Sequence, residues 1–256
     1  MAHLDLHHFI CRDDNYGVLV HDHQSGATAS IVAPDALAVE RALKAKGWQL
    51  THILTTHHHG DHVEGNLALK EAFGCTIIGP RNDGEIPGMD KSVAGGETFT
   101  FAGREVRVMD TPGHTKGHIV YYFPTEHVLF AGDTLFEMGC GRVIEGTLEQ
   151  MWASLDQLRK LPTHTIVHVG HEYSEANARF ALSVEPGNRA LQQRAGVVAA
   201  QRAKGEMTLP TTIGDELKTN VFLRVDSPEI RKRLGLEQAS DAEVFAETRR
   251  RKDSFK

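Results

Sequence analysis

Cysteine is scarce in this chain, and long apolar runs are missing. The 256 residues hold three cysteines, Cys11, Cys75 and Cys140, which are widely spaced and form no CxxC pair. This pattern excludes a disulfide framework and predicts reduced thiols, as in a cytoplasmic protein. No segment approaches the ~18 consecutive apolar residues of a transmembrane helix, and the first residues lack the basic and apolar parts of a secretory signal. We therefore expect a cytoplasmic location and no membrane partner.

Basic residues are too few over most of the chain to suggest nucleic-acid binding. Residues 1–173 contain 13 Lys and Arg against 22 Asp and Glu, a net charge of −9, whereas residues 174–256 contain 15 against 12, a net charge of +3. A nucleic-acid surface needs a dense basic stripe, so we expect no such partner. The modestly basic C-terminal part favours a small anionic substrate or a docking surface instead.

Histidine, in contrast, is abundant and unevenly placed. All sixteen histidines lie between His3 and His171, and none follows. Together with the change of charge, this predicts a domain boundary near residues 172–175, with one domain over residues 1–173 and a second over residues 174–256. Because histidine is the commonest metal ligand, the first domain is the place to search for a metal site.

Apolar periodicity predicts different architectures for the two parts. In the first part, strand patterns alternate with helical ones, and turn residues join several strands as hairpins, which predicts two sheets with helices outside, an αββα sandwich of the α+β class. The second part is predicted to be all-helical. Predicted strands cover 18–20, 29–32, 50–55, 76–78, 98–101, 105–109, 119–123, 127–130 and 165–169. Predicted helices cover 34–46, 65–73, 174–182, 188–204, 228–234 and 240–251, with another between Thr147 and Pro162 and a turn near 213–218.

The densest group of metal-binding residue types follows the predicted strand 50–55. The segment Thr56-His57-His58-His59-Gly60-Asp61-His62 offers three imidazoles and a carboxylate, at His57, His59, Asp61 and His62. Alternate residues of such a turn can face a common centre, so His58 should point away from it. The spacing suits two metal ions a few Å apart, and imidazole with carboxylate suits zinc, iron or manganese.

Three later strand ends carry further ligand types. His114 follows the strand 105–109, Asp133 follows 127–130, and His171 follows 165–169, each just after a glycine. His114 or His171 alone would more often be structural, and Asp133 alone could equally be a turn residue. Four strand ends of the same form nevertheless predict one converging metal site, because open sheets place their chemistry at the carboxyl ends of strands.

This set of residues resembles the metallo-β-lactamase superfamily, whose hallmark is T-H-x-H-x-D-H followed by distant His, Asp and His. Within it, the chain is similar to the glyoxalase II (hydroxyacylglutathione hydrolase) family along nearly its whole length. The supporting segments are Asp14-Asn15-Tyr16, Gly65-Asn66, Gly132-Asp133-Thr134-Leu135-Phe136, Gly139-Cys140-Gly141-Arg142, Gly170-His171-Glu172-Tyr173 and Arg249-Arg250-Arg251-Lys252-Asp253-Ser254-Phe255.

The resemblance implies a sandwich of the metallo-β-lactamase type, a C-terminal helical substrate-binding domain, and two divalent metal ions per chain, with zinc expected and iron or manganese as alternatives. It assigns His57, His59 and His114 to one ion and Asp61, His62 and His171 to the other. Asp133 would bridge both ions together with a hydroxide, so Asp61 and Asp133 are the expected catalytic residues. The implied substrate is S-D-lactoylglutathione, hydrolysed to D-lactate and glutathione by a monomer. The implied glutathione contacts are Arg142, Tyr173, Arg249 and Lys252.

Three positions depart from the family pattern. Ile144 stands where an aromatic residue is usual, Ala33 replaces a probable carboxylate that would support the metal ligands, and Glu64 stands where glycine is usual. Because no expected ligand is changed, we expect effects on metal or substrate affinity rather than on the reaction.

Other functions remain open from the sequence alone. A mononuclear-iron persulfide dioxygenase shares the first domain, but residues 174–256 argue against it because those enzymes lack a long helical C-terminal domain. A β-lactamase or lactonase is a second alternative. A non-enzymatic metal scaffold would require a closed coordination sphere, whereas seven ligands shared by two ions leave positions open.

Overall fold

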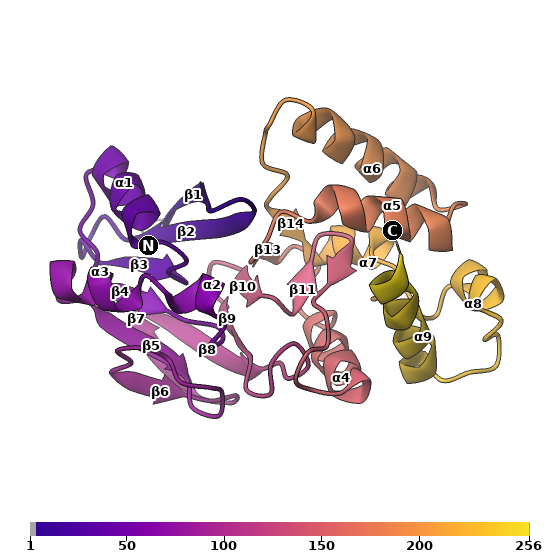
Figure 1. The fold of residues 1–256 in the computed structure, drawn as a ribbon, viewed down its shortest axis with the longest axis horizontal. Coiled ribbons are helices and arrows are strands. Elements are labelled where there is room, and N and C mark those ends of the chain that lie inside the picture. The colour runs from indigo at the N-terminus through magenta and orange to yellow at the C-terminus, as the bar shows by residue number, and fades with distance from the viewer. Residues whose placement is uncertain (1–3, 256) are drawn as a thin grey trace. The chain divides into compact units, whose positions relative to one another are not determined.

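The computed structural model describes residues 4–255, which form two compact units (Figure 1). The first unit comprises the chain to Asp110 and the segment Thr115–Gly132, and the second comprises Thr111–His114 and the chain from Asp133 onward. Over the described residues, no helix is both long and apolar enough to cross a membrane.

The first sheet of the first unit combines antiparallel and parallel pairing. Its strand order is β1(Asp5–Cys11), β2(Asn15–His21), β3(Thr28–Ile31), β4(His52–Leu54), β5(Thr76–Pro80) and β6(Lys91–Val93). Strands β1, β2 and β3 are antiparallel neighbours, whereas β3 to β6 run parallel. The parallel strands β4 and β5 therefore end at the same edge, where the histidine-rich loop begins.

Two helices cover this sheet because each has an apolar face and defined ends. Helix α1 (Ala36–Lys46) starts where the Asp35 side chain accepts a hydrogen bond from the Ala38 amide, and it stops at Gly47 in a left-handed conformation with φ 71°. Its buried face packs into a core that includes Ile53 and Ile77 of the sheet. Helix α3 (Asn66–Phe73) ends at a left-handed glycine in the same way, because glycine has no Cβ to oppose a positive φ.

A second, antiparallel sheet completes the first unit. The strands of this sheet that belong to the first unit are β7(Thr98–Phe101), β8(Arg104–Asp110), β9(Ile119–Phe123) and β10(Val128–Gly132), joined as the predicted hairpins. Strand β8 alternates buried and exposed residues, whereas β9 and β10 are buried throughout. The buried Tyr121 hydroxyl donates to the Thr55 carbonyl at 2.7 Å, so a side chain of this sheet bonds to backbone beside the first sheet. The two face-to-face sheets agree with the predicted sandwich.

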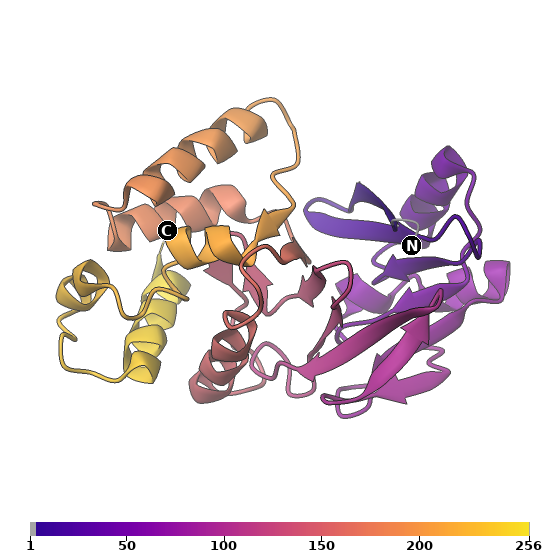
Figure 2. The ribbon, with the colours of Figure 1, turned by 180° about the vertical axis from the view of Figure 1, so that it is seen from behind.

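The second unit is mainly helical. It contains β11(Leu135–Phe136), β12(Gly139–Cys140), α4(Leu148–Leu158), β13(Ile166–Val169), α5(Ser174–Val184), α6(Arg189–Arg202), β14(Thr211–Thr212), α7(Ile213–Thr219), α8(Pro228–Leu234) and α9(Asp241–Ser254). Figures 1 and 2 show α4 and α9 side by side, where the rings of Trp152 and Phe245 lie 5.8 Å apart between centroids. Capping boxes at Thr147 and Ser240 begin α4 and α9.

Ser227 precedes α8, with Pro228 in the first turn, but its side chain does not cap the helix. The hydroxyl donates instead to Glu185, at the end of α5. Glu185 is buried and also receives two hydrogen bonds from Arg224, each of 2.8 Å. Burial acts to raise the pKa of Glu185, but the hydrogen bonds from Arg224, Ser227 and Asn188 hold it below the ordinary glutamate value.

Replacing Glu185 with alanine is expected to lower the free energy of unfolding by about 3 kcal/mol, because Arg224 and Ser227 lose a buried acceptor. A carboxylate with a lowered pKa stabilises the fold above its unfolded pKa, and that contribution is lost as the pH falls below about 4. Urea unfolding at pH 7 and pH 3 measures both effects. The control is Glu175→Ala on the same helix, where the side chain is 58% exposed and makes only a 3.9 Å ion pair. Equal stability of the two variants at pH 7 would contradict the prediction.

Candidate metal centre

The loop after β4 brings four of the expected ligands together within the first unit. His57 and His62 are fully buried, and short helix α2 (Gly60–Val63) carries Asp61 and His62. The ring of His57 lies 4.8 Å from that of His59 and 4.2 Å from that of His62, between centroids. The distance from Asp61 Oδ2 to His62 Nε2 is 3.6 Å. Backbone bonds fix the loop, since the Thr55 amide donates to Ile78 and the Thr56 carbonyl accepts from Ile119.

Two residues that the sequence did not assign to the site support this loop. Asn15 donates from Nδ2 to both Oδ2 and the backbone carbonyl of Asp61, each at 3.1 Å. The ring of His118 stacks on His57 at 4.8 Å between centroids. Asn15 belongs to the Asp14-Asn15-Tyr16 segment that supported the family resemblance, so the sequence held a signal for it. His118 had none, because its contact with His57 joins residues 61 positions apart.

His58 faces a buried carboxylate on a neighbouring loop. Its Nδ1 lies 3.1 Å from Oδ2 of Asp83, and its amide donates to the same oxygen at 3.0 Å. The other oxygen of Asp83 accepts from the Gly117 amide at 3.2 Å. Burial acts to raise the pKa of Asp83, but hydrogen bonds from His58, Thr115 and Gly117 hold it below the usual value. Asp83 thus joins the histidine-rich loop to the segment that follows His114.

The remaining three expected ligands meet within the second unit. Nε2 of His114 lies 3.4 Å from Oδ2 of Asp133, and Nε2 of His171 lies 3.3 Å from the same oxygen. Nδ1 of His114 is 2.8 Å from the carbonyl oxygen of Arg142. Because a carbonyl only accepts, this Nδ1 carries the proton and Nε2 presents a lone pair. Asp133 therefore has one oxygen beside two imidazole nitrogens, as a shared ligand requires.

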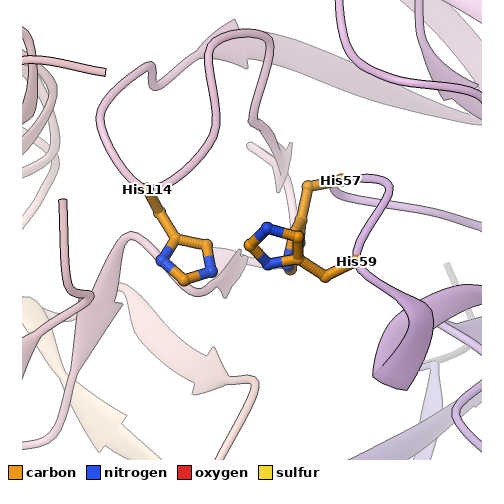
Figure 3. A group of neighbouring side chains, drawn as sticks. All are labelled: His57, His59 and His114. Carbon is orange, nitrogen blue, oxygen red and sulfur yellow. The ribbon is translucent and has the colours of Figure 1, made fainter. Parts of the chain in front are cut away.

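Among residues 4–255, four groups of His, Asp and Glu side chains have ligand atoms within 4.8 Å of one another. One consists of His57, His59 and His114, whose rings Figure 3 shows turned toward a common space. The others are Asp61, His62 and His171; His57, His62 and Asp133; and His58, His59 and Glu145. Imidazoles with carboxylates and no thiolate fit zinc, iron or manganese in a site with open positions. The residues present therefore fit the metal ions that the sequence predicts, and the group with Glu145 was not anticipated.

The expected glutathione contacts differ in accessibility. Arg142 is exposed, and Tyr173 is 38% exposed with its ring stacked on His171. Lys252 is partly buried over the Phe180 ring and donates to the Ala176 carbonyl at 3.0 Å. Burial, together with nearby positive charge, lowers the pKa of Lys252 to about 8. Arg249 is the exception in this set, because only 3% of it is exposed.

Cys140 is buried and does not behave as a nucleophile. Burial raises the pKa of its thiol to about 11, which keeps it protonated near neutral pH.

Two of the three departures from the family pattern lie beside the loop. The Ala33 amide donates to the His62 carbonyl at 2.8 Å, so the backbone at this position still supports the ligand segment without a side-chain carboxylate. Glu64 pairs with Arg12. Ile144 is 53% exposed.

Comparison with known proteins agrees with this geometry. A family model described as the metallo-beta-lactamase superfamily matches residues 25–171, and one described as hydroxyacylglutathione hydrolase C-terminus matches residues 172–255. Among solved structures, ETHE1 from Myxococcus xanthus has a TM-score of 0.67 and 24% identity and covers 94% of this chain and 95% of its own. At that identity the likeness shows the fold alone. The chain is thus a metallo-β-lactamase-fold protein with the helical region of one family within that superfamily.

Curated relatives identify that family. The hydroxyacylglutathione hydrolase of Rhizobium meliloti (strain 1021) is 57% identical over 256 residues and covers 100% of both chains. The protein of the same name from Brucella anthropi is 55% identical over 253 residues and covers 98% of this chain and 97% of its own. The chain belongs to the hydroxyacylglutathione hydrolase family, and the predicted fold class and family are confirmed.

Proposed function

We propose that this chain hydrolyses S-D-lactoylglutathione, and other S-2-hydroxyacylglutathiones, to the hydroxy acid and glutathione. The single observation that carries the proposal is the convergence of the expected ligands, with His57, His59 and His114 in one group and Asp61, His62 and His171 in another. The names of the full-length relatives supply the substrate class.

The proposed ligand sets would hold two divalent ions, and Asp133 would belong to both sets. Zinc is the expected metal, and iron and manganese fit the same donors. Bound divalent ions polarise a carbonyl group and lower the pKa of water, which is the chemistry that thioester hydrolysis needs. The chain itself fixes the positions of the metal-binding groups. The backbone carbonyl of Arg142 accepts a hydrogen bond from the His114 ring, and Asn15 donates one to the Asp61 carboxylate.

Catalysis requires a proton acceptor near the scissile thioester. Asn15 donates to one carboxylate oxygen of Asp61, Oδ2, and to its backbone carbonyl, and we assign to this carboxylate the uptake of the proton from the attacking water. Asp133 keeps His114 and His171 at a common centre. No cysteine nucleophile is needed, in line with the raised pKa of Cys140.

The helical region is proposed to hold the glutathione part. Glutathione carries two carboxylates and one ammonium, so basic residues suit its binding. Arg142, Tyr173, Arg249 and Lys252 are the proposed contacts, and Arg249 and Lys252 both lie on α9. We accordingly propose that residues 1–173 form the metal-binding domain and residues 174–256 the substrate-binding domain. We also propose a cytoplasmic monomer, a location supported by three buried cysteines without disulfides.

The decisive test is hydrolysis of S-D-lactoylglutathione, followed at its thioester absorbance, by purified protein whose metals have been quantified. The expected result is turnover with two metal ions per chain. One iron per chain with oxygen uptake on glutathione persulfide would contradict the proposal, as would cleavage of a β-lactam or lactone in place of the thioester.

Replacing Lys252 with methionine is expected to raise KM for S-D-lactoylglutathione about 10-fold and to leave kcat within about 2-fold, because a lost contact to the glutathione part weakens binding uniformly. Since the pKa of Lys252 is about 8, wild-type KM should rise as the pH passes 8 and the amine loses its charge. That pH dependence should be absent from the variant. Steady-state kinetics between pH 6.5 and 9.5 measure both effects, and an unchanged KM would remove Lys252 from the proposed contacts.

A further inference from the structure

The guanidinium of Arg249 is buried and bonds to groups of the protein itself. Its Nη1 donates to the Cys140 carbonyl at 3.0 Å, and its Nε and Nη2 bond to Oδ1 of Asp253 at 3.0 and 2.7 Å. The group also lies over the ring of Phe222, 5.2 Å from its centroid. Burying a charged guanidinium is costly unless its donors are satisfied, so these partners define where it sits. Arg249 thereby ties α9 to a backbone carbonyl 109 residues earlier.

The carbonyl that Arg249 holds belongs to a turn that runs from Phe136 to Arg142, here called the 136–142 turn. Asn220 fixes its first part by donating to the carbonyls of Phe136 and Gly139, at 3.2 and 2.8 Å. Glu216 accepts from the Met138 amide at 2.8 Å. Arg249 bonds to the second part of the turn, at the backbone carbonyl of Cys140.

The end of the 136–142 turn touches two proposed metal ligands. The carbonyl of Arg142, two residues after Cys140, accepts the hydrogen bond from Nδ1 of His114 at 2.8 Å. At Gly141 an added Cβ would lie 1.9 Å from the Asp133 carbonyl oxygen, so the turn passes Asp133 at a distance only glycine allows. A displacement of the turn would therefore shift the imidazole of His114 and the backbone of Asp133.

We infer that Arg249 is a positioning residue, which through the Cys140 carbonyl holds the turn whose Arg142 carbonyl orients His114. The hydrogen bond at Nδ1 sets the tautomer and direction of the ring, and such partners of metal-binding histidines affect affinity by 10–100-fold. This inference rests on the proposed function in one respect, which is that His114 binds a metal ion. It gives Arg249 a role in the metal centre whether or not a glutathione carboxylate also reaches it.

The test measures zinc affinity directly, by competition with a chromophoric chelator, for the wild type, Arg249→Met and Arg249→Lys. Arg249→Met is expected to weaken the binding of one zinc ion by about 10–100-fold and to lower kcat by about 10-fold or more. Arg249→Lys should recover part of both losses, because an ammonium can donate to the Cys140 carbonyl. The matched control is Arg250→Met, which removes the same charge from the next residue of α9, where the side chain is 63% exposed and pairs with Glu247. Its zinc affinity and kcat should equal those of the wild type.

Thermal unfolding of each zinc-free variant separates this role from a loss of stability. If Arg249→Met is unfolded at the assay temperature, the zinc affinity and kcat of Arg249→Lys are compared with those of Arg250→Met and the wild type. A rise in KM with unchanged zinc affinity and kcat would overturn the inference and leave Arg249 as a substrate contact alone. Failure of the wild type to hydrolyse the thioester would contradict the proposed function instead, and the zinc affinities of the variants would still decide the role of Arg249.

Discussion

Replacing Asp133 with asparagine is expected to lower kcat/KM for S-D-lactoylglutathione by at least about 100-fold, the upper end of the cost of losing a group that only orients a ligand. The reason is the position of Oδ2, which lies within 3.4 Å of Nε2 of both His114 and His171. Asparagine keeps the size of the side chain but removes the negative charge and leaves only one carbonyl oxygen as a donor to metal. We expect bound metal to fall below two ions per chain as well, measured by elemental analysis beside the kinetics.

A matched control for Asp133 is Asp156→Asn. Asp156 lies on α4 and pairs only with Arg159 and Lys160 of the same helix and its end. This change should leave the activity and the metal content at wild-type values. Wild-type rates and two bound ions in Asp133→Asn would show that Asp133 is not the shared ligand.

Removing the metal ions is the second change with a large expected effect. Dialysis against a strong chelator should lower thioester hydrolysis to the background rate, because the proposed reaction depends on bound metal ions to lower the pKa of water. Stepwise return of zinc should restore the rate and reach a plateau at two equivalents per chain. The melting temperature should rise over the same titration, because a ligand that binds only the folded state stabilises it.

Protein dialysed in parallel without chelator provides the control for this experiment, and circular dichroism shows whether the metal-free chain stays folded. A plateau at one equivalent would favour a mononuclear site and contradict the shared role of Asp133. Full activity after chelation, with metal verified as absent, would contradict the metal-dependent mechanism altogether.

The sequence predicted most of the long elements and missed several short ones. Helices such as α4 and α9 carry their own capping boxes, so local signals sufficed. Strand β1 was missed because six of its seven residues are only partly buried or exposed and include two histidines, which gives no apolar run. Strands β6, β11, β12 and β14 have two or three residues each, and helix α2 has four, too few for periodicity to show. Strand β14 pairs with β13, a partner distant in the sequence, whereas β11 and β12 pair only with each other across a short turn.

The candidate site divides in the same way. The sequence identified one set of candidate ligands because its members are close together and follow a strand end: His57, His59, Asp61 and His62. It identified a second set because each member follows the end of a different strand: His114, Asp133 and His171. Local sequence did not show which ligand atoms lie close together. It also did not show that Asn15, His118 and Asp83 contact the histidine-rich loop, because these contacts join residues 25 or more positions apart.

The sequence by itself determined the ligand types, their places at strand ends and the family, because each is a property of short segments. Tertiary structure alone decided that the Arg249 guanidinium is buried and bonds to the Cys140 carbonyl, whereas the sequence would allow it to be exposed on α9. Helical periodicity places Arg249 and Lys252 near one another on α9, but it cannot tell which of them the fold will bury. Burial depends on what packs against the helix, and here that includes Phe222 and the turn at Cys140, which folding brings together from distant parts of the chain.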